Sequence, residues 1–89
     1  MKTLTFTHNK KKYTSKSFDF EAFCLVNEGH ADENIKGTHK CCAPAIEYMF
    51  DGTEGGTLLK EISIAEHIKM SRAVWDMYIE ALNEAAKNE

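Results

Sequence analysis

The chain is 89 residues long, which predicts a single folded domain over residues 1–89. Its hydrophobic content of 43% and its single proline argue against disorder. Its net charge of −3 is unevenly divided. Residues 1–16 hold five lysines and no acid, whereas residues 17–89 hold six Lys or Arg and fourteen Asp or Glu, a balance of −8. This acidic body argues against a nucleic-acid partner, which favours a broad basic face. The basic N-terminal element is either a solvated hairpin or an element that docks on an acidic surface of another copy or of a protein partner.

Hydropathy and cysteine content indicate the compartment. No stretch approaches the ~20 apolar residues of a membrane span, and the first residues lead into no apolar signal-peptide core. We therefore expect a cytoplasmic protein without a membrane partner. Three cysteines, Cys24, Cys41 and Cys42, cannot all pair, and adjacent cysteines are poorly placed to bridge each other. A disulfide framework is not expected.

Residues 2–17 predict a β-hairpin. Leu4 and Phe6 alternate with threonines, as in a strand with one buried face. Asn9 tolerates the left-handed conformation and marks the turn. A two-stranded hairpin is unstable alone, so a helix must cover the face that carries Leu4 and Phe6.

Four helices are predicted, over about 19–28, 41–51, 57–62 and 64–87. Ser17 or Asp19 can cap the first helix. We assign Phe20 and Phe23 to its buried stripe and expect Gly29 to end it.

Pro44 and Gly52 set the expected limits of the second helix. Proline is tolerated in the first turn of a helix and is costly deeper inside, so the regular part should begin near Cys41 to Ala43, with Thr38 to Lys40 as a lead-in. Gly52 is the expected left-handed residue after its end. The fold class is therefore α+β and mainly helical, with an N-terminal β-hairpin followed by three or four α-helices, the last of them long.

The long helix has a strong start signal and two apolar faces. Ser63 and Glu66 have the spacing of a capping box. One series runs along one face through Ile64, Ile68, Trp75, Tyr78, Leu82 and Ala85. We assign this series to the core. A second set lies off it, and we assign it to partner binding: Met70, Val74, Met77 and Ala81. The alternative that both faces are core stays open.

No catalytic, cofactor-binding or metal-binding motif stands out, so we expect a non-enzymatic protein without cofactors. Zinc sites usually use spaced pairs such as Cys-x-x-Cys, which the adjacent Cys41 and Cys42 do not match. Residues 51–57 are glycine-rich but lack the Gly-Lys-Ser/Thr ending of a phosphate-binding loop. The alternative is a small metal- or thiol-dependent protein that uses His39, Cys41 and Cys42. A regulatory binding module is a third reading.

Two motifs and the order of elements point to a family. A short hairpin runs into Phe18-Asp19-Phe20-Glu21-Ala22, and a later helix ends in Tyr48-Met49-Phe50-Asp51-Gly52-Thr53 before a two-part helical C-terminus. Over nearly its whole length the chain resembles the small tail assembly chaperones of long-tailed bacteriophages and prophages.

The resemblance implies a protein that acts in the cytoplasm of a bacterial host cell. Such chaperones bind the tape-measure protein during tail assembly, keep its long helices soluble and help recruit tail-tube subunits. Self-association of this chain is also expected. The members of this family are made in two lengths through a programmed ribosomal frameshift. The resemblance implies the same for this chain, with the codons of Ala86-Lys87-Asn88 as the candidate position.

Overall fold

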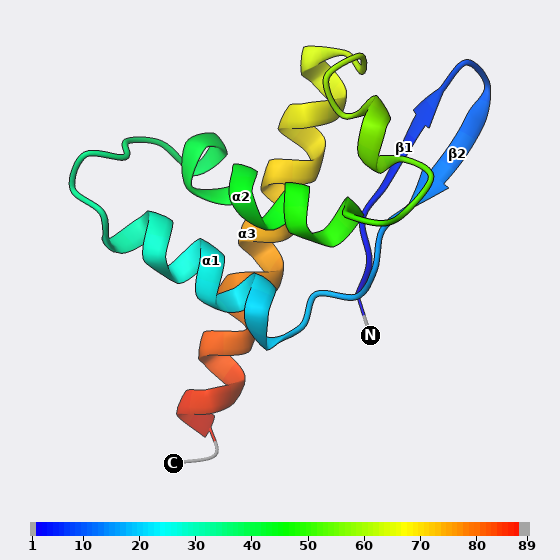
Figure 1. Ribbon diagram of the computed structural model, residues 1–89. Coiled ribbons are helices and arrows are strands. Elements are labelled where there is room, and N and C mark those ends of the chain that lie inside the picture. The colour runs from blue at the N-terminus through cyan, green and yellow to red at the C-terminus, as the bar shows by residue number, and fades with distance from the viewer. Residues whose placement is uncertain (1, 88–89) are drawn as a thin grey trace.

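The computed structural model describes residues 2–87. Across these residues an antiparallel hairpin precedes three α-helices, and the last helix is long, which confirms the predicted α+β class (Figure 1). The elements are β1 Thr5–His8, β2 Lys11–Thr14, α1 Phe20–Ala31, α2 Thr38–Phe50, the 3-10 turn η1 Gly56–Leu58, and α3 Ile64–Lys87. α2 packs against both α1 and α3 and is therefore the central helix.

The hairpin has the predicted turn and the predicted buried face. Phe6 pairs with Tyr13 and His8 with Lys11, so the connecting loop is Asn9-Lys10. Asn9 and Lys10 have φ angles of 50° and 66°, as a two-residue turn between twisted strands requires. Leu4 and Phe6 are both 2% exposed.

Aromatic packing and backbone hydrogen bonds attach the hairpin to α2. The Phe6 ring lies 5.3 Å from the Tyr13 ring and 5.2 Å from the Phe50 ring, measured between centroids. The Lys16 amide donates to the Met49 carbonyl at 2.9 Å. The hairpin thus closes one end of the core, where α2 ends.

α1 starts as expected but does not end at Gly29. Asp19 is its N-cap, and the carboxylate accepts from the Ala22 amide at 3.0 Å. The helix continues through Gly29 to Ala31 because Gly29 is a packing contact: a Cβ there would lie 2.8 Å from the Cys41 carbonyl oxygen. The assignment of Phe20 to the core is also wrong, since this side chain is 78% exposed.

α2 begins at Thr38, three residues before the predicted start, and contains Pro44 in its interior. Pro44 cannot donate to the Lys40 carbonyl, but both residues are exposed, so water can bond that carbonyl instead. Gly52 has the predicted left-handed conformation, with φ 77°. The helix expected over 57–62 is reduced to η1, followed by turns.

α3 has the predicted bounds and start. The Ser63 hydroxyl accepts from the Glu66 amide at 3.2 Å, which is one half of the expected capping box. Its core contacts come from Met70, Val74 and Tyr78, which are 2%, 0% and 3% exposed. These residues are spaced four apart and form one stripe in the middle of the helix.

Candidate protein-binding surface

An apolar groove lies between the start of α1 and the C-terminal half of α3. Its volume is about 360 Å³, and it is lined by Phe18, Asp19, Phe20, Phe23, Ala81 and Ala85. Phe20 stacks on Phe23 with ring centroids 6.3 Å apart, yet most of its surface faces solvent. We refer to this site as the apolar groove.

The cap of α1 fixes the aromatic wall of the apolar groove. The Asp19 carboxylate bonds the Ala22 amide and also accepts from the Tyr48 hydroxyl of α2 at 2.7 Å. These two hydrogen bonds lower the pKa of the Asp19 carboxyl below its ordinary value. Phe23 packs against Tyr78, with ring centroids 5.0 Å apart. The start of α1 is therefore tied to both other helices.

A smaller depression of about 180 Å³ adjoins the apolar groove and shares Phe18 and Ala81 with it. Met77, Glu80 and Glu84 complete its α3 side. Lys2 closes its other side and forms an ion pair with Glu80.

The buried residues of α3 follow neither predicted face: Tyr78 of the predicted core series is buried as expected, but several members of both sets are misassigned. Met70 and Val74 lie in the core, so the prediction that they present an exposed strip to a partner is wrong. Met77 and Ala81 are half-buried and line the smaller depression. Ile64 and Leu82, which were assigned to the core, are 78% and 40% exposed.

Sequence reasoning missed Phe20 as a surface residue, although a signal for its position exists. The buried residues of α1 are Ala22, Val26 and Gly29, at steps of four and three. Phe20 precedes Ala22 by two positions, which places it on nearly the opposite side of the helix. If the small residues, and not the aromatic ones, are taken to define the buried face of α1, Phe20 is predicted to face solvent.

The three residues of the metal or thiol alternative do not form one site. Cys41 and Cys42 are 4% and 0% exposed, whereas His39 is exposed. Burial, helped by the neighbouring Cys41, raises the pKa of the Cys42 thiol to about 12, which disfavours the reactive thiolate. Within residues 2–87 no group of three or more His, Cys, Asp or Glu side chains is placed to hold a metal ion.

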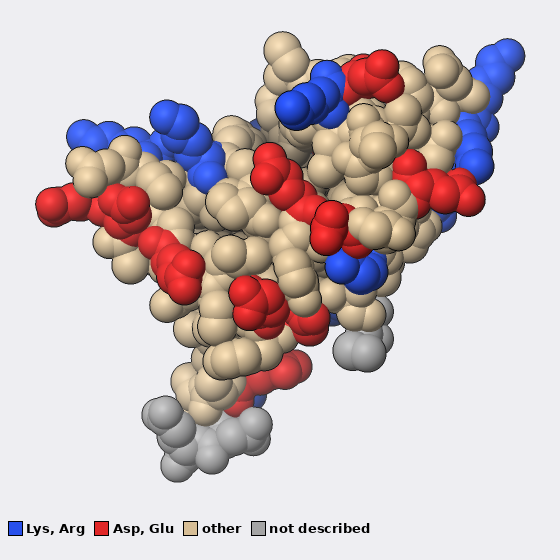
Figure 2. Space-filling model, viewed as in Figure 1, with Lys and Arg blue, Asp and Glu red and all other residues tan. Residues whose placement is uncertain are grey.

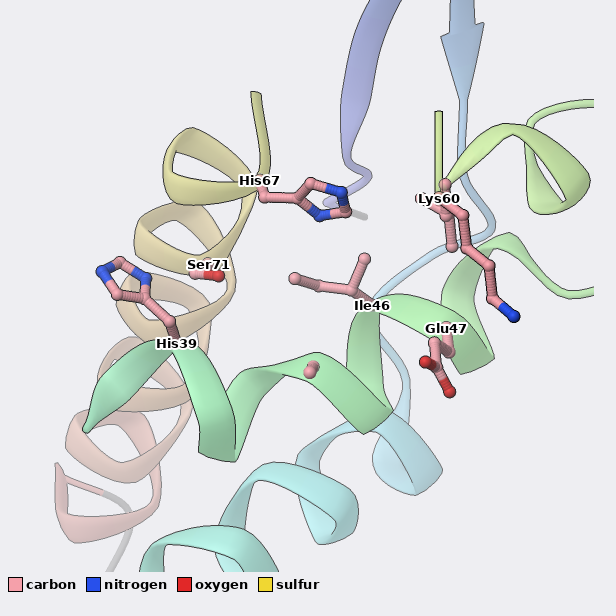
Figure 3. A pocket seen from close by; sticks show the side chains of 8 residues that line it. His39, Ile46, Glu47, Lys60, His67 and Ser71 are labelled. Atoms are coloured by element: carbon pink, nitrogen blue, oxygen red, sulfur yellow. The ribbon is translucent and has the colours of Figure 1, made fainter. Parts of the chain in front are cut away.

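A second cleft, of about 350 Å³, lies between α2, α3 and the turn after η1. Figure 3 shows its labelled lining residues, His39, Ile46, Glu47, Lys60, His67 and Ser71. We refer to it as the histidine cleft. It involves the N-terminal half of α3, whereas the apolar groove involves the C-terminal half.

The hairpin tip is rich in lysine, as the sequence predicts, while the rest of the surface carries charges of both signs. The hairpin tip carries Lys10, Lys11 and Lys12, and acidic side chains spread over the helices (Figure 2). Lys11 is paired with Glu54 at 2.7 Å, and this contact raises the pKa of the lysine and lowers that of the glutamate.

Among the described residues no helix is both long and apolar enough to cross a membrane. Comparisons of the chain with models of known protein families, with curated proteins and with solved structures find no match.

Proposed function

We propose that this protein is a non-enzymatic binding protein that holds the apolar face of a partner helix in the apolar groove. The observation that carries the proposal is the exposure of Phe20, 78%, at the edge of an apolar depression. Exposed aromatic side chains beside an apolar groove are typical of surfaces that bind amphipathic helices. The groove runs between two helices, so a third helix can pack along it.

Charge around the groove indicates the kind of helix. Asp19 lines the groove, Glu84 lines the adjoining depression, and both are exposed, while Glu80 is already paired with Lys2. A partner helix with Lys or Arg on both sides of its apolar stripe would complement this rim. Such complementarity speeds association and makes it sensitive to salt.

The identity of the partner is proposed from the family resemblance. Small tail assembly chaperones of bacteriophages bind tape-measure helices and recruit tail-tube subunits, and we propose the same partners here. The segment Phe18-Asp19-Phe20, on which the resemblance partly rests, forms one wall of the groove. The cytoplasm of a bacterial host and a frameshifted longer form belong to the same proposal. Asn88, at the candidate frameshift position, lies outside the described residues.

Two exposed apolar residues provide a matched test. Phe20 and Ile64 are each 78% exposed, but Ile64 begins α3 at the end away from the groove. The probe would be a purified helical segment of any long coiled-coil-rich protein that the neighbouring genes encode. Binding of the purified helical segment would then be measured for the wild type, Phe20→Ser and Ile64→Ser.

Burying a phenylalanine stabilises a complex by roughly 1.5–3 kcal/mol, so Phe20→Ser should weaken binding by about ten- to a hundredfold. Ile64→Ser should bind like the wild type. Equal binding by all three proteins, or a loss confined to Ile64→Ser, would show that the partner lies elsewhere. No binding by the wild type would remove the proposed partner.

Self-association is proposed separately, since an uncovered apolar groove can also take a second copy. Sedimentation velocity across a wide concentration range would show oligomers that Phe20→Ser weakens. A monomer at every concentration would exclude self-association, and the helical partner would remain the occupant of the groove.

A further inference from the structure

We propose that the histidine cleft binds a small organic carboxylate with an apolar body. This site is independent of the proposed partner surface, because it lies at the other half of α3. Its volume of about 350 Å³ falls in the range of small-molecule sites. Such sites combine an apolar lining with a few polar groups that fix the ligand's orientation.

The floor of the cleft is apolar and belongs to the core. Ile46 and Leu59 are 4% and 9% exposed, so their positions are set by packing in the interior. Ala43 lines the cleft beside them with a small side chain. A ligand's apolar body can therefore rest on this floor and remove both surfaces from water.

Hydrogen-bond donors flank the floor. His67 and Ser71 are four residues apart on α3, so they lie on one face of the helix. The His67 imidazole extends over Ile46, and His39 of α2 lies beside Ser71 (Figure 3). His67 and Ser71 thus offer an imidazole N–H and a hydroxyl on one face of α3, and His39 offers a further imidazole N–H from α2 at the edge of the same cleft.

The opposite rim carries one charge of each sign, and the preference for an anion comes from the donors near Ser71. Lys60 supplies an ammonium group, which has donors only, and Glu47 is the one carboxylate in the lining. Both side chains project away from the His67 ring (Figure 3), which leaves the donor region without a fixed negative charge. A carboxylate can accept from His67 and Ser71 while its apolar body covers Ile46 and Leu59, and His39 lies at the edge of the same cleft. A cation would find no carboxylate among the groups next to Ser71.

The test uses 3-phenylpropionate as the probe and its neutral amide, 3-phenylpropionamide, as the matched control. Each would be titrated to about 20 mM into the full chain, with amide chemical shifts followed by NMR, because simple fragments bind in the millimolar range. We expect the carboxylate to shift the signals of Leu59, His67 and Ser71 and to bind at least about tenfold more tightly than the amide, the effect of one charge-assisted hydrogen bond.

Three variants separate the polar groups. His67→Leu and His39→Leu should each weaken carboxylate binding several-fold and leave amide binding unchanged, whereas Glu47→Gln should keep or strengthen carboxylate binding. His39 is exposed, so its variant remains informative even where His67→Leu fails to fold. The proposal is overturned by absence of shifts at the highest concentration, by equal affinity for acid and amide, or by shifts confined to the apolar groove.

Discussion

Replacing Gly29 with alanine should destabilise this protein, although the same change usually stabilises a helix. In a helix interior alanine is favoured over glycine by about 1 kcal/mol. Gly29 lies inside α1, but its backbone is in contact with α2. A Cβ at this position would lie 2.8 Å from the Cys41 carbonyl oxygen and 3.0 Å from both Cα and Cβ of Cys41.

The loss of stability expected for Gly29→Ala follows from the backbone atoms that have to move. Ordinary contact begins at 3.4 Å, so α1 and α2 must separate locally by about 0.6 Å, the difference between 3.4 and 2.8 Å. The atoms in the way belong to the backbone of a helix, which cannot rotate aside as a side chain can. Overpacking of this kind costs about 1–3 kcal/mol, and backbone contact places the cost near the upper end. After the helix preference is subtracted, about 2 kcal/mol of net destabilisation remains.

The assay is thermal unfolding followed by far-UV circular dichroism. A loss of about 2 kcal/mol in a domain of this size lowers the midpoint by roughly 8–16 °C. Glu28→Ala is the control, because Glu28 is exposed in the same turn of α1 and its change should stay within about 0.5 kcal/mol. A Gly29→Ala protein as stable as the wild type, or more stable, would refute the close approach of α1 to α2 at Cys41.

Three further predictions concern side chains. At pH 8 the Cys42 thiol should react with a disulfide reagent far more slowly than the half-buried Cys24 thiol. A pKa near 12 leaves Cys42 with about a thousandfold less thiolate than an ordinary thiol has. Similar reaction rates for the two thiols would mean that Cys42 is not buried. Asp19→Ala should lower the melting temperature at pH 7. The difference in melting temperature between this variant and the wild type should narrow as the pH falls below about 4, because a carboxylate with a lowered pKa stabilises the fold only while it is ionised. Tyr78 donates to Asn27 Oδ1 at 2.7 Å, so Tyr78→Phe should cost about 0.5–1.5 kcal/mol, and a double-mutant cycle with Asn27→Ala that shows no coupling would contradict this bond.

The features that the sequence predicts correctly are local ones. The Leu4 and Phe6 alternation, the left-handed turn at Asn9 and the Asp19 cap each depend on residues a few positions apart. Such signals need no knowledge of the rest of the fold. The start of α3 at Ser63 belongs to the same class.

The errors on α1 and α3 concern contacts between elements. Glycine is a typical residue at the end of a helix, so Gly29 is expected to end α1. Its role in packing follows only from the position of Cys41 on α2. On α3 both apolar faces have suitable residues, and the choice between them depends on where α1 and α2 lie. The small residues that let α1 approach α2, Ala22 and Gly29, decide that geometry and also turn Phe20 outward. Periodicity within one helix cannot supply this information.

The way α3 is buried explains why candidate sites lie at both of its ends. Its 24 residues span about 36 Å, but the fully buried stripe from Met70 to Tyr78 covers only about 12 Å of that length. The histidine cleft is lined by His67, before this stripe, and by Ser71, at its start, whereas the apolar groove is lined by Ala81 and Ala85, after it. Polar substitutions of Met70 or Val74 should therefore destabilise the fold and weaken both sites together. Substitutions at either end should remove one site and leave the fold and the other site intact, so the two proposed sites can be tested separately in one chain.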